Sequence, residues 1–184
     1  VLVFLLMAIC QTNFRHFVGK SRPPSEVLKK LNLDLENRIR EDMFITLFLA
    51  IIDTQANTIT YARAGHEPAL LAREDKKGRT SVEKLHGGGM AIGMVPSEFF
   101  EESIEDQVVD FNAGDIMVLF TDGVTEAENE EREEFGLDRL SDKLSSSLAL
   151  GAEEFNEGLL SDLDDFSSDS FKRDDVTILT VKRT

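Results

Sequence analysis

Apolar residues near the start of the chain recur at helical spacing, which predicts a helix over residues 2–18 that Gly19 is suited to end. The apolar residues that share one face of this helix are Leu2, Leu5, Leu6, Ile9 and Phe17. A second helix is predicted after Pro23 and Pro24, with Ser25 as its N-cap. Its apolar face is marked by Leu28, Leu31, Leu35 and Ile39. The chain is therefore expected to open with a pair of amphipathic helices.

The middle of the chain changes to the pattern of β-strands separated by polar turns. Residues 44–52 are rich in side chains that favour strands, and residues 58–62 follow as a second strand after the turn residues 53–57. This pattern predicts a β-hairpin. Shorter strands are predicted at residues 69–72 and around residues 82–85, with a charged turn between them.

A second hairpin is predicted from residues 104–111 and 116–120, which flank the turn residues 112–115. The run Gly87–Gly89 predicts a flexible loop, because it lacks the Lys-Ser/Thr ending of a phosphate-binding P-loop. The final apolar run, at residues 176–181, is typical of a central strand that is buried on both faces.

Between these strands the spacing of apolar residues becomes helical again. One apolar stripe comprises Leu137, Leu140, Leu144 and Leu148, and a second comprises Phe155, Leu159, Leu163 and Phe166. Two helices, many strands, two further helices and a terminal strand predict an α+β fold. Because antiparallel hairpins dominate, the sheets are expected to pack on each other with the helices outside.

The composition is that of an acidic globular domain. The 184 residues fit one domain better than two, and 41% of them are hydrophobic, which is enough for a sizeable core. The formal net charge of -15 argues against binding to nucleic acid or to anionic lipid, since both need clustered Lys and Arg. The charge does not argue against a phosphorylated substrate, because bound cations reverse the sign of the electrostatic field inside a site.

The single cysteine, Cys10, excludes a disulfide within the chain, which suits a reducing cytoplasm, and we interpret it as a buried apolar residue. The apolar run at residues 1–10 is too short to span a bilayer and lacks the flanks of a signal peptide. Because the chain opens inside this run without Met, we expect the protein to extend further toward its N-terminus.

Asp122 is the first candidate for site chemistry. It comes directly after the apolar strand at residues 116–120 and precedes Gly123, so a rigid strand end would hold its carboxylate. Hard cations such as Mg²⁺ and Mn²⁺ take oxygen ligands of this kind. Asp-Gly is also a common turn dipeptide, and from spacing alone the turn is the better-supported interpretation.

Asp174 and Asp175 form a second candidate, directly before the final strand. Adjacent carboxylates repel each other, and a nearby cation would relieve that repulsion. Other aspartates lie close in sequence, so a solvated loop explains this pair better when it is taken alone. His66 has no second histidine at ligand spacing and is interpreted as a turn residue rather than a zinc ligand. His16 and His86 have no partner motif.

Five segments carry a family resemblance when they are taken in order. They are Met43–Phe48, Tyr61–Pro68, Leu119–Ala127, Phe135–Gly136 and Asp174–Ile178. Each is modest alone, but together they resemble the SpoIIE/RsbU-type branch of the metal-dependent PP2C-like phosphatases, over nearly the whole chain. The resemblance implies a PP2C-like α-β-β-α sandwich, in which two mostly antiparallel sheets are flanked by helix pairs.

The resemblance also implies a protein serine/threonine phosphatase. Two Mn²⁺ or Mg²⁺ ions would lower the pKa of a bridging water, and the resulting hydroxide would attack phosphoserine or phosphothreonine in line. Asp122 and Asp174 match the family's metal-ligating aspartates and are the expected catalytic residues. Asp175 takes a supporting role, Gly123 would let the backbone approach the metals, and His66 would belong to a structural turn.

One family motif is absent from the 184 residues, namely an Asp followed shortly by Gly-His-Gly, which helps to hold the metal pair and should precede the opening helix. We therefore interpret residues 1–184 as one SpoIIE/PP2C-like phosphatase domain that lacks its N-terminal strands and first metal motif. The alternative is a catalytically silent pseudophosphatase that binds a phosphoprotein. A nucleotidyl cyclase-like domain is disfavoured, because that fold expects β-α-α-β-β-α-β order.

The resemblance further implies a role in signal transduction and the stress response. Relatives dephosphorylate small anti-sigma-factor antagonists, so the expected partner is a phosphorylated regulatory protein of that type. An upstream sensor or receiver domain is expected in the full-length chain, and a homodimer is left open. The expected location is the cytoplasm, with any membrane tether in an upstream domain and no direct membrane insertion by this segment.

Overall fold

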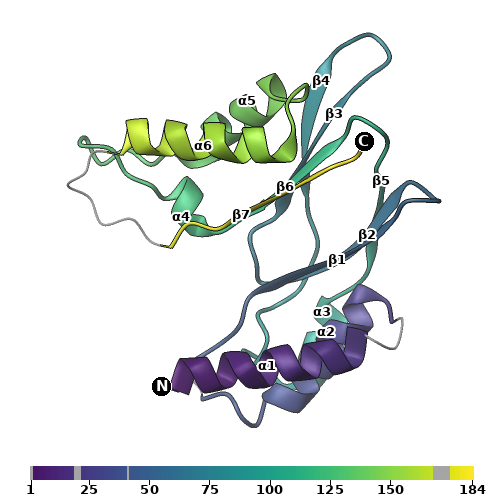
Figure 1. Ribbon diagram of the computed structural model, residues 1–184. Coiled ribbons are helices and arrows are strands. Elements are labelled where there is room, and N and C mark those ends of the chain that lie inside the picture. The colour runs from purple at the N-terminus through teal and green to yellow at the C-terminus, as the bar shows by residue number, and fades with distance from the viewer. Residues whose placement is uncertain (1, 19–21, 41, 168–174) are drawn as a thin grey trace. The chain divides into compact units, whose positions relative to one another are not determined.

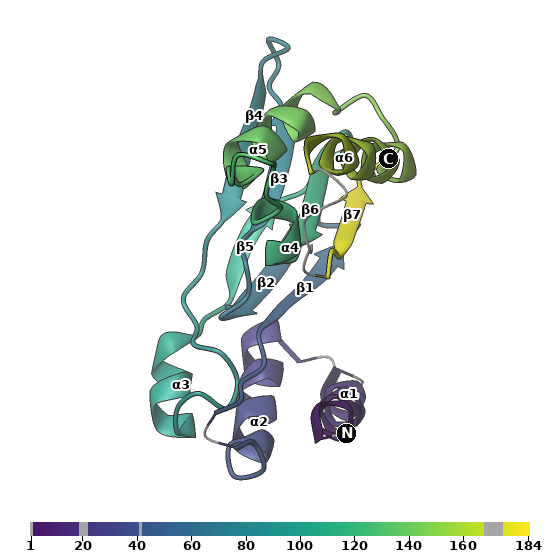
Figure 2. The same cartoon turned by 90° about the vertical axis from the view of Figure 1, so that its left-hand side faces the viewer.

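The computed structural model describes most of the chain. The described residues are 2–18, 22–40, 42–167 and 175–184. They form two compact units, each of which is an antiparallel sheet with helices packed on it (Figures 1 and 2). The first unit comprises Val1–His66 and Gly87–Phe111, and the second comprises Glu67–His86 and Asn112–Thr184. The prediction of an α+β fold with two antiparallel sheets is confirmed.

The first unit contains, in the described residues, a sheet of strand order β1-β2-β5. Its elements are α1 (Leu2–Val18), α2 (Pro24–Leu35), β1 (Leu47–Asp53), β2 (Thr58–Ala64), α3 (Ser97–Ser103) and β5 (Gln107–Asp110). β1 and β2 form the first predicted hairpin, with Asp53 opposite Thr58. The carboxylate of Asp53 accepts hydrogen bonds from the N–H groups of Gln55 and Ala56, at 2.8 and 2.9 Å, and so closes the turn.

The second opening helix buries most of the apolar face that the sequence predicts, although Ile39 lies beyond the end of this helix. Leu28, Leu31 and Leu35 of α2 are fully buried. Residues from α1, α2 and β2 share one core, among them Leu6, Cys10, Leu28, Leu31, Leu35, Ala62 and Ala64. The expected packing of α2 on α1 is therefore confirmed. Gly19 and the side chains of Leu2 and Leu5 lie outside the described part of the chain.

The N-terminus of α2 differs from the prediction. Ser25 is not the N-cap, because the helix begins at Pro24 and Pro23 occupies the cap position without a side-chain hydrogen bond. Instead, the N–H of Ser25 donates to Oδ1 of Asp106 at 2.8 Å, and its hydroxyl donates to Oδ2 at 2.7 Å. Proline has no N–H to satisfy and is well suited to the first helical position, so a residue distant in sequence completes the cap.

The run Gly87–Gly89 lies in an irregular segment, as the sequence predicts, and hydrogen bonds hold it near the end of β2. Arg63 donates to the carbonyl oxygen of Gly87 from Nε at 3.2 Å and from Nη2 at 2.8 Å. Gly89 has a φ of +132°, and a Cβ there would lie 1.9 Å from the carbonyl oxygen of Arg63. The carbonyl oxygen of Gly89 accepts a hydrogen bond from the N–H of Gly65 at 3.0 Å. Glycine is needed here because two backbones approach closely.

The second unit contains, in the described residues, a sheet of strand order β4-β3-β6-β7. Its elements are β3 (Ala69–Glu74), β4 (Thr80–Leu85), β6 (Ile116–Phe120), α4 (Asp122–Thr125), α5 (Gly136–Ser146), α6 (Ala152–Phe166) and β7 (Ile178–Lys182). β3 and β4 form a hairpin around the predicted charged turn. α5 and α6 pack on this sheet, and the predicted stripes are buried at Leu140, Leu144, Phe155, Leu159 and Leu163.

The predicted second hairpin is wrong. β5 and β6 are consecutive in sequence, but β5 pairs with β2 in one sheet, whereas β6 pairs with β3 and β7 in the other. The turn between them bonds to the chain near the end of β7. The N–H of Gly114 donates to the carbonyl oxygen of Arg183 at 2.8 Å, and the N–H of Arg183 donates to that of Asp115 at 2.9 Å. The chain therefore crosses from one sheet to the other at Asn112–Asp115.

The last strand is also more exposed than the sequence predicts. Among the described residues β7 pairs with β6 alone, so it lies at an edge of the sheet. The side chain of Leu179 is 57% exposed, whereas Ile178 packs against the core beneath α5 and α6. The expectation of a central strand buried on both faces is therefore wrong. None of the helices in the described ranges is both long and apolar enough to cross a membrane.

Candidate metal centre

Asp122 lies where a buried strand ends. Ile116, Met117, Val118 and Phe120 of β6 are buried. The backbone stays extended at the next residue, and α4 then begins at Asp122 itself. The side chain of Asp122 is exposed, and its Oδ1 accepts a hydrogen bond from the N–H of the buried residue Gly123 at 3.0 Å. A solvent-accessible carboxylate is thus placed at the end of a rigid strand.

The segment before β7 meets this strand end. The N–H of Thr121 donates to the carbonyl oxygen of Thr177 at 3.1 Å, and the hydroxyl of Thr121 donates to the carbonyl oxygen of Asp175 at 2.9 Å. Figure 1 shows α4 at the end of β6, beside the start of β7. Asp175 is therefore anchored next to the residue that precedes Asp122. The sequence pattern did not single out Thr121, although its position at a strand end and directly before Asp122 was the available signal.

Asp174, the second expected catalytic and metal-ligating residue, lies outside the described residues. Its neighbour Asp175 is exposed and is the first described residue before β7. The structure therefore brings Asp122 and Asp175 to the same end of the paired strands β6 and β7. The assignments of Asp122, Gly123, Asp174 and Asp175 as metal-site residues stay predictions.

The residue types at this end of the strands fit a hard divalent cation. Mg²⁺ and Mn²⁺ prefer carboxylate, carbonyl and water oxygens. The ion pairs found among the described residues do not include Asp122. In the same residues no group of three or more His, Cys, Asp and Glu side chains is arranged to hold a metal. The site therefore suits such a cation by the type of its ligand atoms, which are the carboxylate oxygens of the exposed residues Asp122 and Asp175.

His66 and Cys10 both lie in the first unit. His66 lies in the irregular segment after β2, and Nη1 of Arg63 donates to its carbonyl oxygen at 2.5 Å. The preceding residue, Gly65, has a φ of +67°, in the left-handed region that favours glycine. Cys10 is buried, and burial raises the pKa of its thiol above the ordinary value. Both residues therefore belong to the framework of the first unit.

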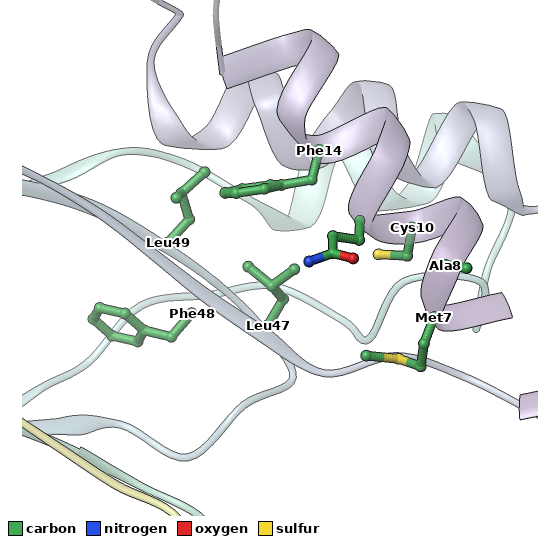
Figure 3. A pocket seen from close by; sticks show the side chains of 8 residues that line it. Met7, Ala8, Cys10, Phe14, Leu47, Phe48 and Leu49 are labelled. Carbon is green, nitrogen blue, oxygen red and sulfur yellow. The ribbon is translucent and has the colours of Figure 1, made fainter. Parts of the chain in front are cut away.

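A cavity of about 600 Å³ between α1 and β1 has a different character. Figure 3 shows Leu47 and Leu49 on the side of β1 that faces α1, and Phe48 on the other side. The lining is mostly apolar and consists of Met7, Ala8, Cys10, Gln11, Phe14, Leu47, Phe48 and Leu49. Because the described residues that line it include no carboxylate, this lining does not suit a divalent cation.

Comparison with known proteins identifies the family. Residues 4–184 match the family described as Stage II sporulation protein E (SpoIIE). The chain belongs to the SpoIIE family. Two curated proteins are similar to this SpoIIE-family chain: protein IcfG of Synechocystis sp. is 33% identical over 144 residues, and phosphoserine phosphatase RsbU of Bacillus subtilis is 38% identical over 107 residues.

The matches cover different shares of the proteins. They span 77% of this chain and 21% of IcfG, and 58% of this chain and 30% of RsbU. The chain thus spans less than a third of the length of either relative. Among solved structures, the SiaA-PP2C domain of Pseudomonas aeruginosa is similar with a TM-score of 0.80 and 21% identity, covering 98% of this chain and 70% of that one. The expected PP2C-like fold of a SpoIIE/RsbU-type domain is therefore confirmed.

Proposed function

We propose that the full-length protein is a metal-dependent serine/threonine protein phosphatase and that this chain forms most of its phosphatase domain. Asp122 and Asp174 are the catalytic metal ligands, with Asp175 and Gly123 in supporting positions. The observation that carries the proposal is the anchoring of Asp175 beside the strand end that presents Asp122. Membership of the SpoIIE family supports it, as does the similarity to a protein named phosphoserine phosphatase.

The chain itself contributes carboxylates whose positions are restricted by hydrogen bonds. When bound, Mn²⁺ or Mg²⁺ would supply an activated water and polarise the phosphoryl oxygens. The N–H of Gly123 engages Oδ1 of Asp122 at 3.0 Å and so restricts rotation of the carboxylate, while the exposed side chain stays accessible. The hydrogen bond from the hydroxyl of Thr121 likewise restricts the backbone of Asp175. Fixed ligands need less reorganisation when they bind an ion.

We further propose that residues 1–184 supply only part of the metal centre, with the family's Asp and Gly-His-Gly motif contributed by sequence before Val1. Two divalent cations held close together need several carboxylates to offset their charge. The isolated chain is therefore expected to show little turnover at millimolar Mn²⁺, and restoring the upstream segment is expected to rescue it. Equal turnover by the isolated chain and the full-length protein would contradict this division of ligands.

The proposed substrate is phosphoserine or phosphothreonine on a small cytoplasmic regulatory protein of the anti-sigma-factor antagonist type. The name of RsbU supports phosphoserine as the target. A phosphoprotein approaches this chain against a formal net charge of -15, so bound cations have to provide the local attraction. An upstream sensor or receiver domain would then control when the phosphatase acts.

The direct test is Mn²⁺-dependent hydrolysis of a phosphoserine protein, or of p-nitrophenyl phosphate, by the full-length protein. Asp122→Asn is expected to lower kcat by several orders of magnitude, because a lost metal ligand leaves the attacking water unactivated. Asp142→Asn replaces another exposed aspartate, on α5, and is expected to keep the wild-type rate. Near wild-type turnover by Asp122→Asn would refute the assignment.

The same assay separates the enzyme from the silent binding module. A phosphatase releases inorganic phosphate from the phosphoserine protein, and a chelator abolishes that release. Binding of the phosphoserine protein by the wild type, without any release of phosphate at saturating Mn²⁺, would support the pseudophosphatase instead.

A further inference from the structure

The regular ladder between β6 and β7 ends at a threonine whose hydroxyl continues it. The last ladder pair joins Phe120 to Ile178. One residue further on, the N–H of Thr121 donates to the carbonyl oxygen of Thr177 at 3.1 Å. The return bond does not go to a backbone carbonyl, because the N–H of Thr177 donates to Oγ1 of Thr121 at 2.9 Å. A side chain therefore takes the place of the backbone acceptor at this point.

The same hydroxyl also reaches the acidic segment. Oγ1 of Thr121 donates to the carbonyl oxygen of Asp175 at 2.9 Å while it accepts the bond from Thr177. A hydroxyl carries one donor and two acceptor lone pairs, so it is able to do both at once. Serine shares this capacity. Valine has nearly the same shape as threonine but has neither a donor nor an acceptor, and it would leave both backbone groups without this partner.

We propose that Thr121 is a positioning residue for the metal centre: its hydroxyl fixes the backbone of Asp175 and the start of β7 beside the strand end that carries Asp122. The inference rests on the proposed function and extends it to a residue that touches neither metal nor substrate. Thr121 acts through Asp175, to which it is hydrogen-bonded, and through Asp122, which follows it in the chain.

Carboxylates that share a metal site repel one another until the metal arrives. A segment that is free to move relieves this repulsion by moving away, and metal binding then has to bring it back. The two hydrogen bonds of the Thr121 hydroxyl hold the backbone at Asp175 and Thr177 and so oppose that movement. Because they engage uncharged backbone groups, they add no charge to the site. Partners that orient metal ligands in this way typically change metal affinity or activity by roughly 10- to 100-fold when they are removed.

A merely structural role makes a different prediction. If the hydroxyl only closes the strand pair, its loss lowers stability and leaves metal affinity unchanged. The chain offers a matched control in Thr180 of β7, whose hydroxyl donates to Oδ1 of Asn156 at 2.6 Å. Thr180→Val removes a hydrogen bond of the same strand, between two half-buried residues, away from the acidic segment.

The experiment compares Thr121→Val, Thr121→Ser and Thr180→Val in the full-length protein. Mn²⁺ affinity is measured by calorimetry, and exchange of the Thr177 amide hydrogen is measured without metal. Thr121→Val is expected to weaken Mn²⁺ binding roughly 10- to 100-fold and to speed exchange at Thr177, because the acceptor of that N–H is gone. Thr121→Ser is expected to restore both properties, and Thr180→Val is expected to keep wild-type Mn²⁺ affinity.

Wild-type Mn²⁺ affinity in Thr121→Val, or equal weakening in Thr180→Val, would overturn the inference. Thr121→Ala takes the place of the valine variant if that variant does not fold, with the same expected loss. Turnover is recorded separately: a wild type that binds Mn²⁺ in a Thr121-dependent way but releases no phosphate would refute the proposed function and leave the positioning role standing.

Discussion

Two helix starts in this molecule use an aspartate in opposite ways. At α2, both carboxylate oxygens of Asp106 accept hydrogen bonds from Ser25, one from its N–H at 2.8 Å and one from its hydroxyl at 2.7 Å. At α4, Asp122 is itself the first helical residue, its side chain is exposed, and one of its oxygens accepts a bond from the adjacent N–H of Gly123. The first carboxylate joins distant segments, whereas the second presents its charge to solvent.

The contrast shows that residue type alone does not separate a structural acid from a candidate ligand. Asp106 satisfies donors of a residue that is only 8% exposed, so its removal should affect folding. Among the residues that the structure describes, the carboxylate of Asp122 accepts a local hydrogen bond from Gly123 and takes part in none of the ion pairs, so its replacement should affect chemistry more than folding.

The largest effect is expected on turnover, when a proposed metal ligand is replaced. Asp174→Asn in the full-length protein should lower kcat by several orders of magnitude and leave the unfolding temperature nearly unchanged, because a metal ligand is lost and the fold is not. Phosphate release and thermal unfolding measured on the same preparation check both parts. A variant that loses activity only because it unfolds would remove Asp174 from the candidate site.

The second effect concerns the core that holds α2 in place. Leu31 is fully buried, together with Leu28 and Leu35. Leu31→Ala should therefore lower the free energy of unfolding by about 2–5 kcal/mol, as truncation of a buried leucine usually does. Leu33, on the exposed side of the same helix, is 56% exposed and provides the control, because Leu33→Ala should change stability little. Denaturant unfolding of both variants makes the measurement, and equal losses would show that burial is not what matters.

A smaller loss is expected when the structural acid is removed. Asp106→Ala leaves the N–H and the hydroxyl of Ser25 without their acceptors, which should cost about 1–3 kcal/mol. Phosphatase turnover of the folded fraction should stay close to that of the wild type. If Asp106→Ala abolished turnover at unchanged stability, the two aspartates would not differ as proposed.

The smallest effect is expected at an exposed turn. The pKa of Asp75 is lowered by hydrogen bonds from the N–H of Arg79, then from the side chain of Arg79, and then from the N–H of Lys77. A carboxyl whose pKa is lower in the folded state stabilises the fold above its unfolded pKa, and that stabilisation is lost as the pH falls through the folded pKa. Asp75→Ala should therefore be slightly destabilising at neutral pH and neutral in acid. A pH-independent difference in unfolding would contradict this cause.

Features that follow from periodicity were predictable from the sequence. The leucines of α2, the stripes of α5 and α6, and the hairpin at Asp53 depend on local spacing and turn chemistry, and the structure confirms them. Asp122 and Asp175 could be named in advance through the family resemblance. The exposure of β7 was predicted wrongly, because a run of β-branched and apolar residues fits an edge strand and a central strand alike.

Features that depend on contacts between distant segments were not predictable in the same way. The cap of Ser25 comes from Asp106, and the packing of Gly89 depends on the backbone of Arg63. The polar turn at Asn112–Asp115 has the composition of a hairpin turn, but its partner is Arg183 rather than the preceding strand. The bonds of the Thr121 hydroxyl likewise join residues that lie more than fifty positions apart in sequence.

The central claim is that the end of β6 and the segment before β7 form a metal centre around Asp122. Calorimetric titration of the full-length protein with Mn²⁺ tests it most directly, with Asp122→Asn and Asp106→Ala as the matched pair. We expect the wild type and Asp106→Ala to bind Mn²⁺ alike, and Asp122→Asn to lose at least one binding step. A wild-type isotherm for Asp122→Asn would contradict the account.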